Sequence, residues 1–331
     1  MFQTEIIIYI QSFANEFLNF FFLSVTGLGY ESFIRPFLII FIFGVSYQRG
    51  FLLLHLVLWT AIATEILKEL FALPRPSHVD SAVQLPGKEY KNATILKGMG
   101  AKSFFGSLPQ QGIEYIRKYR FDSFGFPSGH TSGAVALWGG LAVLFRKRLL
   151  TIMCIALIIL IPFSRLYLGR HFLADIIGGY FIGLIFLAIF CKYIFFNEEF
   201  RQLFFNIVQK TDLNSKAVLL IFYLFIIPPL LLLLPKVDRQ MSAILLGINI
   251  GFFLVRLKGM PDSSATIRMR FFRVAISMII FIAISMVTNW LSEFVLSVES
   301  FLLEYIIQAI SMGLMIWIST ETIIKLKLMS R

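Results

Sequence analysis

Long apolar stretches recur along almost the whole chain of 331 residues, and short polar segments separate them. A helix that crosses a membrane needs about 20 mostly apolar residues, and these stretches approach that length. The predicted spans are residues 31–47, 51–71, 127–145, 149–166, 172–195, 216–235, 242–257, 274–295 and 303–324. The expected fold class is therefore all-α, a polytopic transmembrane helical bundle of about nine spans.

The remaining segments complete a predicted domain organisation. The N-terminal residues lack the basic start of a signal peptide, and Gln11, Asn15 and Glu16 interrupt their apolar run. Residues 3–28 are therefore expected to form one amphipathic, interfacial helix. The Pro228-Pro229 pair should kink or break the sixth span. The predicted domains are an interfacial helix at 1–30, a membrane core at 31–195 with an extracytoplasmic insertion at 77–126, a cytoplasmic linker at 196–215 and a four-span region at 216–331.

Composition supports the membrane assignment and narrows the partners. The chain is 58% hydrophobic and 15% charged, with a mean hydropathy of +0.80, which is far from the composition of soluble domains. A formal net charge of +11 raises the question of nucleic acid, but the basic residues lie largely in loops beside apolar spans. Membrane orientation explains them there, so we expect no nucleic-acid partner. The two cysteines lie inside apolar runs and indicate neither a disulfide framework nor a metal cluster.

Basic residues in the short connections predict the orientation. They occur at Arg49, at 146–148, at 256–273 and in the tail from Lys325. Positive charge in short loops marks the cytoplasmic side. The insertion and the turn at 167–171 then face outward, which predicts a multi-pass protein of the cell (inner) membrane.

Three polar clusters interrupt the apolar background, all at the outer ends of spans, where ionisable groups are candidates for function. The first cluster contains Lys68 and Arg75-Pro76. A separation of seven residues is about two helical turns, which would place both cations on one helix face. Two such cations invite an anion, whereas a single cation could simply snorkel to lipid headgroups.

The second cluster is Pro127-Ser128-Gly129-His130, at the start of a predicted helix. Free backbone N–H groups and a hydroxyl at a helix N-terminus suit a phosphate group. His130 lies on the first turn and could donate a proton, although a capping turn with an incidental histidine would have the same sequence.

The third cluster contains Arg165, His171 and Asp175. Residues four apart share a helix face, so the carboxylate can accept from one imidazole nitrogen and leave the other nucleophilic. Arg165 supplies a planar donor for phosphate oxygens. The simpler alternative is a salt-linked helix terminus.

Together the clusters read K-x6-R-P, P-S-G-H and S-R-x5-H-x3-D, which resembles the three-part signature of the type-2 phosphatidic acid phosphatase (PAP2) superfamily over about residues 31–195. The resemblance implies that His171 attacks phosphorus, His130 protonates the leaving group and Asp175 orients His171. It further implies phosphate binding by Lys68, Arg75, Ser128, Gly129 and Arg165. No cofactor or metal is expected, since no second carboxylate is placed to hold one.

The expected function is therefore hydrolysis of a lipid phosphate or pyrophosphate within the membrane, through a phosphohistidine. Two alternatives stay open. A phosphotransferase would use the same residues with an organic hydroxyl in place of water, and a lipid transporter or scramblase would also have many spans with buried charges. The insertion and the additional C-terminal spans depart from compact six-span relatives. Those spans could form a lipid groove, a homodimer surface or a second activity.

Overall fold

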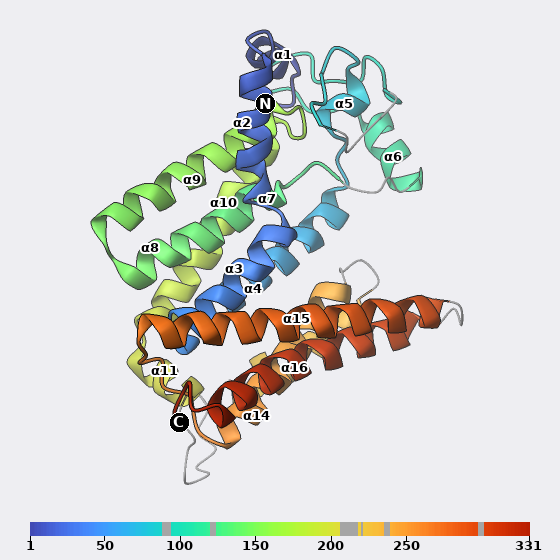
Figure 1. Ribbon diagram of the computed structural model, residues 1–331. Helices are drawn as coiled ribbons and strands as arrows, with labels where there is room; N and C mark the ends of the chain where they lie inside the picture. Colours follow the sequence, from blue (N-terminus) through green and yellow to red (C-terminus); the bar gives the residue numbers. More distant parts are fainter. Residues whose placement is uncertain (88–93, 120–123, 206–217, 220, 235–238, 297–300) are drawn as a thin grey trace. The chain divides into compact units, whose positions relative to one another are not determined.

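A computed structural model describes residues 1–87, 94–119, 124–205, 218–219, 221–234, 239–296 and 301–331. Within these ranges the regular secondary structure is entirely helical (Figure 1). The chain forms two compact units: Met1–Ile34 with Trp59–Ala188, and Arg35–Leu58 with Ile189–Arg331. Helices α3 (Glu31–Gly44) and α4 (Tyr47–Phe71) contribute to both units.

The first unit holds most of the predicted membrane core. Its other helices are α1 (Glu5–Gln11), α2 (Glu16–Gly27), α5 (Pro76–Val79), α6 (Gln110–Tyr119), α7 (Gly129–Ala134), the π-helical η1 (Val135–Gly139), α8 (Gly140–Phe145), α9 (Arg148–Tyr167) and α10 (Leu173–Phe190). Segments α7, η1 and α8 follow one another without a break from Gly129 to Phe145.

Glycines allow α7 and its leading segment to lie very close to α10. A Cβ at Gly178 would lie 2.5 Å from the ring of Phe126, and one at Gly179 would lie 2.6 Å from the carbonyl oxygen of Ser128. Side chains larger than hydrogen would push the two segments apart. The close approach holds the second polar cluster against the start of α10.

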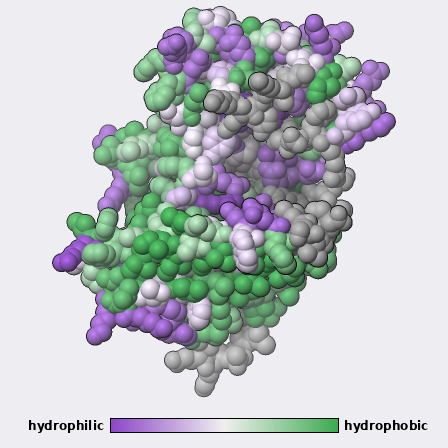
Figure 2. Space-filling view, turned by 45° about the vertical axis from the view of Figure 1, so that its right-hand side comes forward, coloured by the Kyte–Doolittle hydropathy of each residue, from purple (hydrophilic) through white to green (hydrophobic). Residues whose placement is uncertain are grey.

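The insertion is a packed structure that shares a core with α1. Buried Ile7 of α1 joins Val83, Leu108 and Ile116 of the insertion in one hydrophobic cluster. Buried Gln11 donates its side-chain amide to the carbonyl oxygens of Gln84 and Tyr167, each at 2.8 Å. Figure 2 shows hydrophilic residues gathered at this end of the unit. The insertion and α1 thus form one cap.

The N-terminal residues differ from the single helix predicted over 3–28. They form α1 and α2, which are separated at residues 12–15, and the side chain of Asn15 caps α2 by accepting from the Leu18 N–H. A second break follows at residues 28–30, where α2 and α3 meet at an angle of 51°. Short polar side chains compete with the helical backbone for hydrogen bonds, which explains the first break.

The second unit contains the C-terminal membrane region. Its other helices are η2 (Cys191–Phe195), α11 (Glu198–Phe205), η3 (Phe222–Ile226), α13 (Ile227–Leu232), α14 (Arg239–Leu257), α15 (Ile267–Leu296) and α16 (Phe301–Lys325). Residues 196–205 of the predicted 196–215 linker lie among the described residues, and they include α11. Figure 2 shows a broad hydrophobic surface over this unit, and apolar side chains of α15 such as Ile279, Met286 and Trp290 are exposed.

Two local features organise this unit. A Cβ at Gly251 of α14 would lie 2.4 Å from the carbonyl oxygen of Gly313 in α16, so these helices touch through their backbones. The chain changes from π-helix to α-helix at Ile227, just before Pro228-Pro229. Pro228 has no N–H for the carbonyl of Leu224, and Asn249 of α14 donates to that carbonyl instead, at 2.8 Å.

Six described helices have the length and apolarity to cross a membrane, and the bent pair α2 with α3 would raise the number to seven. The shorter apolar helices Gly129–Phe145 and Phe222–Leu232 occupy the predicted third and sixth spans. The multi-pass helical fold is thus confirmed, whereas the count of nine stays a prediction.

Candidate active site

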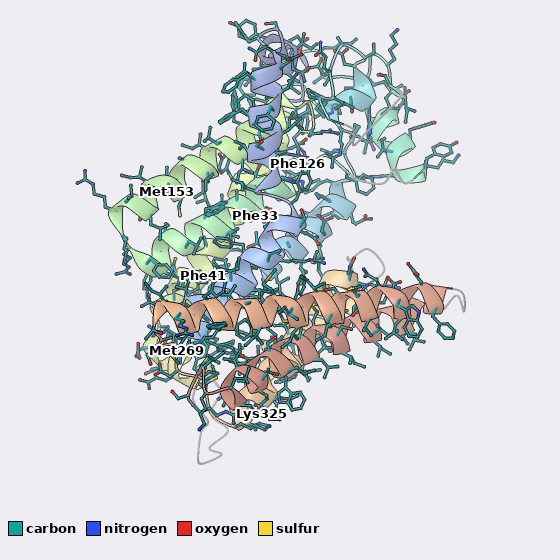
Figure 3. All side chains as sticks on the ribbon, viewed as in Figure 1. Phe33, Phe41, Phe126, Met153, Met269 and Lys325 are labelled. Atoms are coloured by element: carbon teal, nitrogen blue, oxygen red, sulfur yellow. The ribbon has the colours of Figure 1, made fainter. Side chains whose placement is uncertain are left out.

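All three polar clusters lie in the first unit, where the C-terminal ends of α4 and α9 meet the N-terminal ends of α7 and α10. A backbone hydrogen bond joins the second and third clusters directly, because the Ser128 N–H donates to the carbonyl oxygen of Asp175 at 2.9 Å. Just before Ser128, Phe126 (labelled in Figure 3) packs its ring 5.0 Å from that of Phe71 at the end of α4. The structure therefore brings together segments separated by about a hundred residues.

His171 and Asp175 form the pair that their spacing predicted. His171 Nδ1 lies 3.2 Å from Asp175 Oδ2, and the two side chains are 2% and 0% exposed. The same carboxylate oxygen accepts from the Phe172 backbone N–H at 2.9 Å, which fixes the carboxylate at the start of α10. With Nδ1 donating to Asp175, the Nε2 atom of His171 keeps its lone pair.

The electrostatic environment keeps His171 neutral. Burial is the main reason that the pKa of His171 lies well below its ordinary value, and the positive charges of Arg75, Arg165 and Lys68 lower this pKa further. A neutral imidazole surrounded by cations can act as a nucleophile toward an anionic phosphate, because the cations attract the group that the imidazole attacks.

The start of α7 brings several polar groups close together. Ser128 is fully buried, and its Oγ has no hydrogen-bond partner among the described residues. Lys68 Nζ lies 3.4 Å from the position that a Cβ of Gly129 would occupy, so the ammonium group lies beside the helix start. Lys68 also pairs with Glu65 at 2.6 Å. A hydroxyl, an ammonium group and a helix N-terminus thus converge there.

Arg75 reaches the site by a different route from the one predicted. Helix α4 ends at Phe71, so Lys68 and Arg75 do not share a helix face, and that expectation is wrong. Ala72 has a left-handed φ of 48°, and Arg75 is extended with ψ of 162°. Pro76 disfavours the helical conformation in the residue before it. Arg75 Nη1 donates to the Arg170 carbonyl oxygen at 3.0 Å, next to His171.

The sequence did not predict that the N-terminal helices contribute residues to the site. Arg165 is buried, and its Nη1 donates to Thr26 Oγ1 at 2.8 Å and to the Tyr30 hydroxyl at 3.2 Å. The Tyr30 ring also lies edge-on to the His130 ring, with centroids 4.6 Å apart. No motif marks these residues. Buried Arg170 was likewise missed, and its guanidinium donates to the carbonyl oxygen of Pro86 at 3.2 Å.

Each predicted site residue therefore belongs to one connected group. Among the residues that the structure describes, no group of three or more His, Cys, Asp or Glu side chains could hold a metal ion. The positive charge of the group comes instead from Lys68, Arg75, Arg165 and Arg170.

The fold and the site together define a class of protein. It is a multi-pass helical membrane protein with a buried His–Asp pair among cations. Residues 49–199 match the family model of the PAP2 superfamily, which confirms the resemblance that the three motifs predicted for this part of the chain.

Several known proteins resemble parts of the chain. It is 37% identical over 76 residues to the lipid A 4'-phosphatase of Porphyromonas gingivalis, covering 22% of this chain and 32% of that protein. It is 26% identical over 129 residues to phosphatidylglycerophosphatase B of Bacillus subtilis, covering 35% of this chain and 64% of that protein. The crystal structure of Aquifex aeolicus LpxE superposes with a TM-score of 0.43 and 23% identity, over 58% of this chain and 96% of that chain. The chain thus spans 32% to 64% of the length of these two curated relatives.

Proposed function

We propose that this chain is an integral membrane phosphatase that hydrolyses a lipid phosphate or pyrophosphate through a phosphohistidine at His171. The observation that carries the proposal is the buried pair of His171 and Asp175, with Nδ1 and Oδ2 3.2 Å apart, in a group of cations. A carboxylate on Nδ1 leaves Nε2 available to attack, and the cations favour an anionic substrate.

In the proposed reaction, Lys68, Arg75, Arg165 and the Ser128-Gly129 helix start hold the phosphate oxygens. The Nε2 lone pair of His171 forms a bond to phosphorus while the bond from phosphorus to the lipid oxygen breaks. His130 gives a proton to that departing oxygen. A water molecule then attacks phosphorus with His130 as base, the bond to His171 breaks, and inorganic phosphate leaves.

The relatives support a lipid as the substrate. The names of the two curated relatives describe them as acting on lipid A and on phosphatidylglycerophosphate, and both names denote phosphatases of membrane lipids. The site lies at the ends of apolar helices, where a lipid headgroup would be found. A phosphomonoester or diphosphate on a lipid anchor is therefore the substrate class proposed for this chain.

We infer that the site faces the extracytoplasmic side of the inner membrane. Helix α9 begins at Arg148, next to Arg146 and Lys147, and its last turn carries Arg165 of the site. A 20-residue helix is about 30 Å long, so the basic turn and the site lie at opposite membrane surfaces. Basic short loops favour the cytoplasm, and this supports a site on the outer side.

The test is phosphate release by the purified protein in detergent. Lipid A, phosphatidylglycerophosphate, phosphatidic acid and a polyprenyl pyrophosphate are offered separately in EDTA, without an acceptor alcohol. We expect release from at least one lipid, complete loss in His171→Ala, and inhibition by orthovanadate, which forms a five-coordinate oxyanion.

Three results would count against the proposal. A requirement for added Mg²⁺ after chelation would refute the metal-free site. Dephosphorylation of the lipid only with an added alcohol, with the phosphate recovered on that alcohol, would indicate the phosphotransferase. Undiminished turnover in His171→Ala would exclude the covalent route. His55→Ala serves as the matched control, because His55 is equally buried but belongs to the second unit.

A further inference from the structure

The break between α2 and α3 lies against the candidate active site. Residues 28–30 are here called the elbow. Each of their backbone N–H groups donates to the carbonyl oxygen three residues earlier, at the end of α2: Leu28 to Val25, Gly29 to Thr26 and Tyr30 to Gly27. Helix α3 then starts in a new direction, 51° away. An interruption in an apolar pair of helices exposes backbone groups and is tolerated in a membrane only where protein or water covers it. At this interruption the covering protein is the active site.

The first contact of the elbow is with Arg165. Its Nη1 donates to Thr26 Oγ1 at 2.8 Å and to the Tyr30 hydroxyl at 3.2 Å. The guanidinium carbon also lies 5.7 Å from the centre of the Tyr30 ring. Thr26 and Arg165 are both buried. Two oxygens and an aromatic ring thus fix the direction of a guanidinium group that has five donors in one plane.

The second contact is with His130. The His130 and Tyr30 rings meet edge to face, with centroids 4.6 Å apart. A Cβ at Gly29 would lie 2.6 Å from His130 Cδ2, closer than any real contact, so glycine is required for the imidazole to take its place. The Nε2 atom of His130 is buried and has no hydrogen-bond partner among the described residues. The elbow therefore holds the imidazole through its carbon atoms and leaves Nε2 for other chemistry.

We propose that the elbow, with Thr26, is a positioning element that fixes Arg165 and His130 relative to each other on the leaving-group side of the site. This inference rests on the proposed phosphatase function. Tyr30 is the residue that links the two contacts, because its hydroxyl meets Arg165 and its ring meets His130. Thr26, Gly29 and Tyr30 act through those two side chains and are positioning residues, with no direct role in bond formation.

The two contacts predict different kinetic effects. Thr26→Val keeps the side-chain shape and removes an acceptor from Arg165, so phosphate binding should weaken, with KM about tenfold higher. Gly29→Ala displaces His130, so proton transfer to the leaving group should suffer. Loss of a positioned general acid slows turnover by about 10²- to 10⁴-fold, but a leaving group that needs no proton escapes this loss.

The experiment compares two lipid substrates, an alkyl phosphate and an acylated nitrophenyl phosphate, whose aryl oxygen leaves without a proton. Gly29→Ala should lose kcat on the alkyl substrate and keep most of it on the aryl one. Tyr30→Leu should show this loss together with a higher KM. Tyr30→Phe keeps the ring and should raise only KM, so it restores the leaving-group behaviour.

Gly27→Ala is the matched control. Gly27 ends α2, two residues from Gly29, and a Cβ there would meet nothing within 4 Å. This variant should behave as wild type on both substrates. Equal losses on the two substrates in Gly29→Ala and Tyr30→Leu would overturn the inference, as would a Gly27→Ala protein impaired to the same degree as Gly29→Ala.

A second measurement separates the inference from the proposed function. If the wild-type protein releases phosphate from neither substrate, the proposed function fails, and orthovanadate binding, followed by the rise in Tm, then tests the elbow. Thr26→Val should need about tenfold more vanadate for the same rise, because Arg165 has lost an acceptor that holds it in place. Unchanged vanadate affinity in Thr26→Val would overturn the positioning role.

Discussion

Replacing Asp175 by asparagine separates the charge of this side chain from its hydrogen bonds. One oxygen, Oδ2, serves both His171 Nδ1 at 3.2 Å and the Phe172 N–H at 2.9 Å. The other, Oδ1, is buried without a partner among the described residues. An asparagine amide should therefore turn its oxygen to the Oδ2 position, where it keeps both hydrogen bonds, and lose only the negative charge.

The magnitude follows from the hydrogen bond to His171. A hydrogen bond to a charged group contributes about 1.5–3 kcal/mol and a neutral one about 0.5–1.5 kcal/mol. The difference, about 1–1.5 kcal/mol, corresponds to a roughly tenfold loss of kcat in Asp175→Asn. Asp175→Ala removes the orienting oxygen altogether and should lose about 10²-fold or more.

The assay measures initial rates of phosphate release in mixed micelles at neutral pH, with elution volume and Tm as checks on folding. Rapid alkaline quenching with labelled substrate measures the phosphohistidine in the same variants, and its rate of formation should fall in the same order. An Asp175→Asn protein as inactive as Asp175→Ala would show that the shared-oxygen geometry is wrong. Wild-type rates in both variants would show that Asp175 does not orient His171.

Three further results are expected. Burial, and after it the charge of Arg75, lower the pKa of His171, so its neutral form persists in mildly acidic solution. Profiles of kcat/KM against pH, measured for two substrates whose phosphates ionise at different pH, should share no fall on the acid side near pH 6.5. A fall there with both substrates would contradict this. In a cysteine-free background, Phe105→Cys, at a side chain that is 83% exposed in the insertion, should react with an impermeant maleimide in intact cells; reaction only after permeabilisation would invert the topology. Gly251→Ala should reduce stability by about 1–3 kcal/mol, seen as a lower Tm, because its Cβ would lie 2.4 Å from a carbonyl oxygen of α16. Gly133→Ala, with nothing within 4 Å of its Cβ, should leave the Tm unchanged or higher.

Local spacing predicted the parts of the site that depend on one stretch of backbone. His171 and Asp175 are four residues apart, and the start of α10 turns this separation into a contact. The same reasoning failed for Lys68 and Arg75, because the helix ends between them at Phe71, before a left-handed Ala72 and Pro74. Sequence spacing gives a distance only where the backbone geometry is known.

The contacts between distant segments could not be predicted from the sequence. Thr26 and Tyr30 contact Arg165, although they precede it in the sequence by 139 and 135 residues. They lie in a segment whose sequence predicts an apolar helix. Tyrosine is common at membrane surfaces, so its presence does not by itself indicate a site. Of the two glycines between them, only Gly29 is required beside His130, and a single glycine in a sequence has many other causes.

The side chain of Gln11 sets an order of events during synthesis. Its amide binds Gln84 and Tyr167, which follow it by 73 and 156 residues. At a translation rate of about 5–20 residues per second, roughly 8–30 s pass between the synthesis of Gln11 and that of Tyr167. Throughout that interval α1 lacks the partners that bury it, and its amide must be hydrated or held by another protein. Helix α1 is made before the insertion, yet it is among the last parts of the cap to reach its final place.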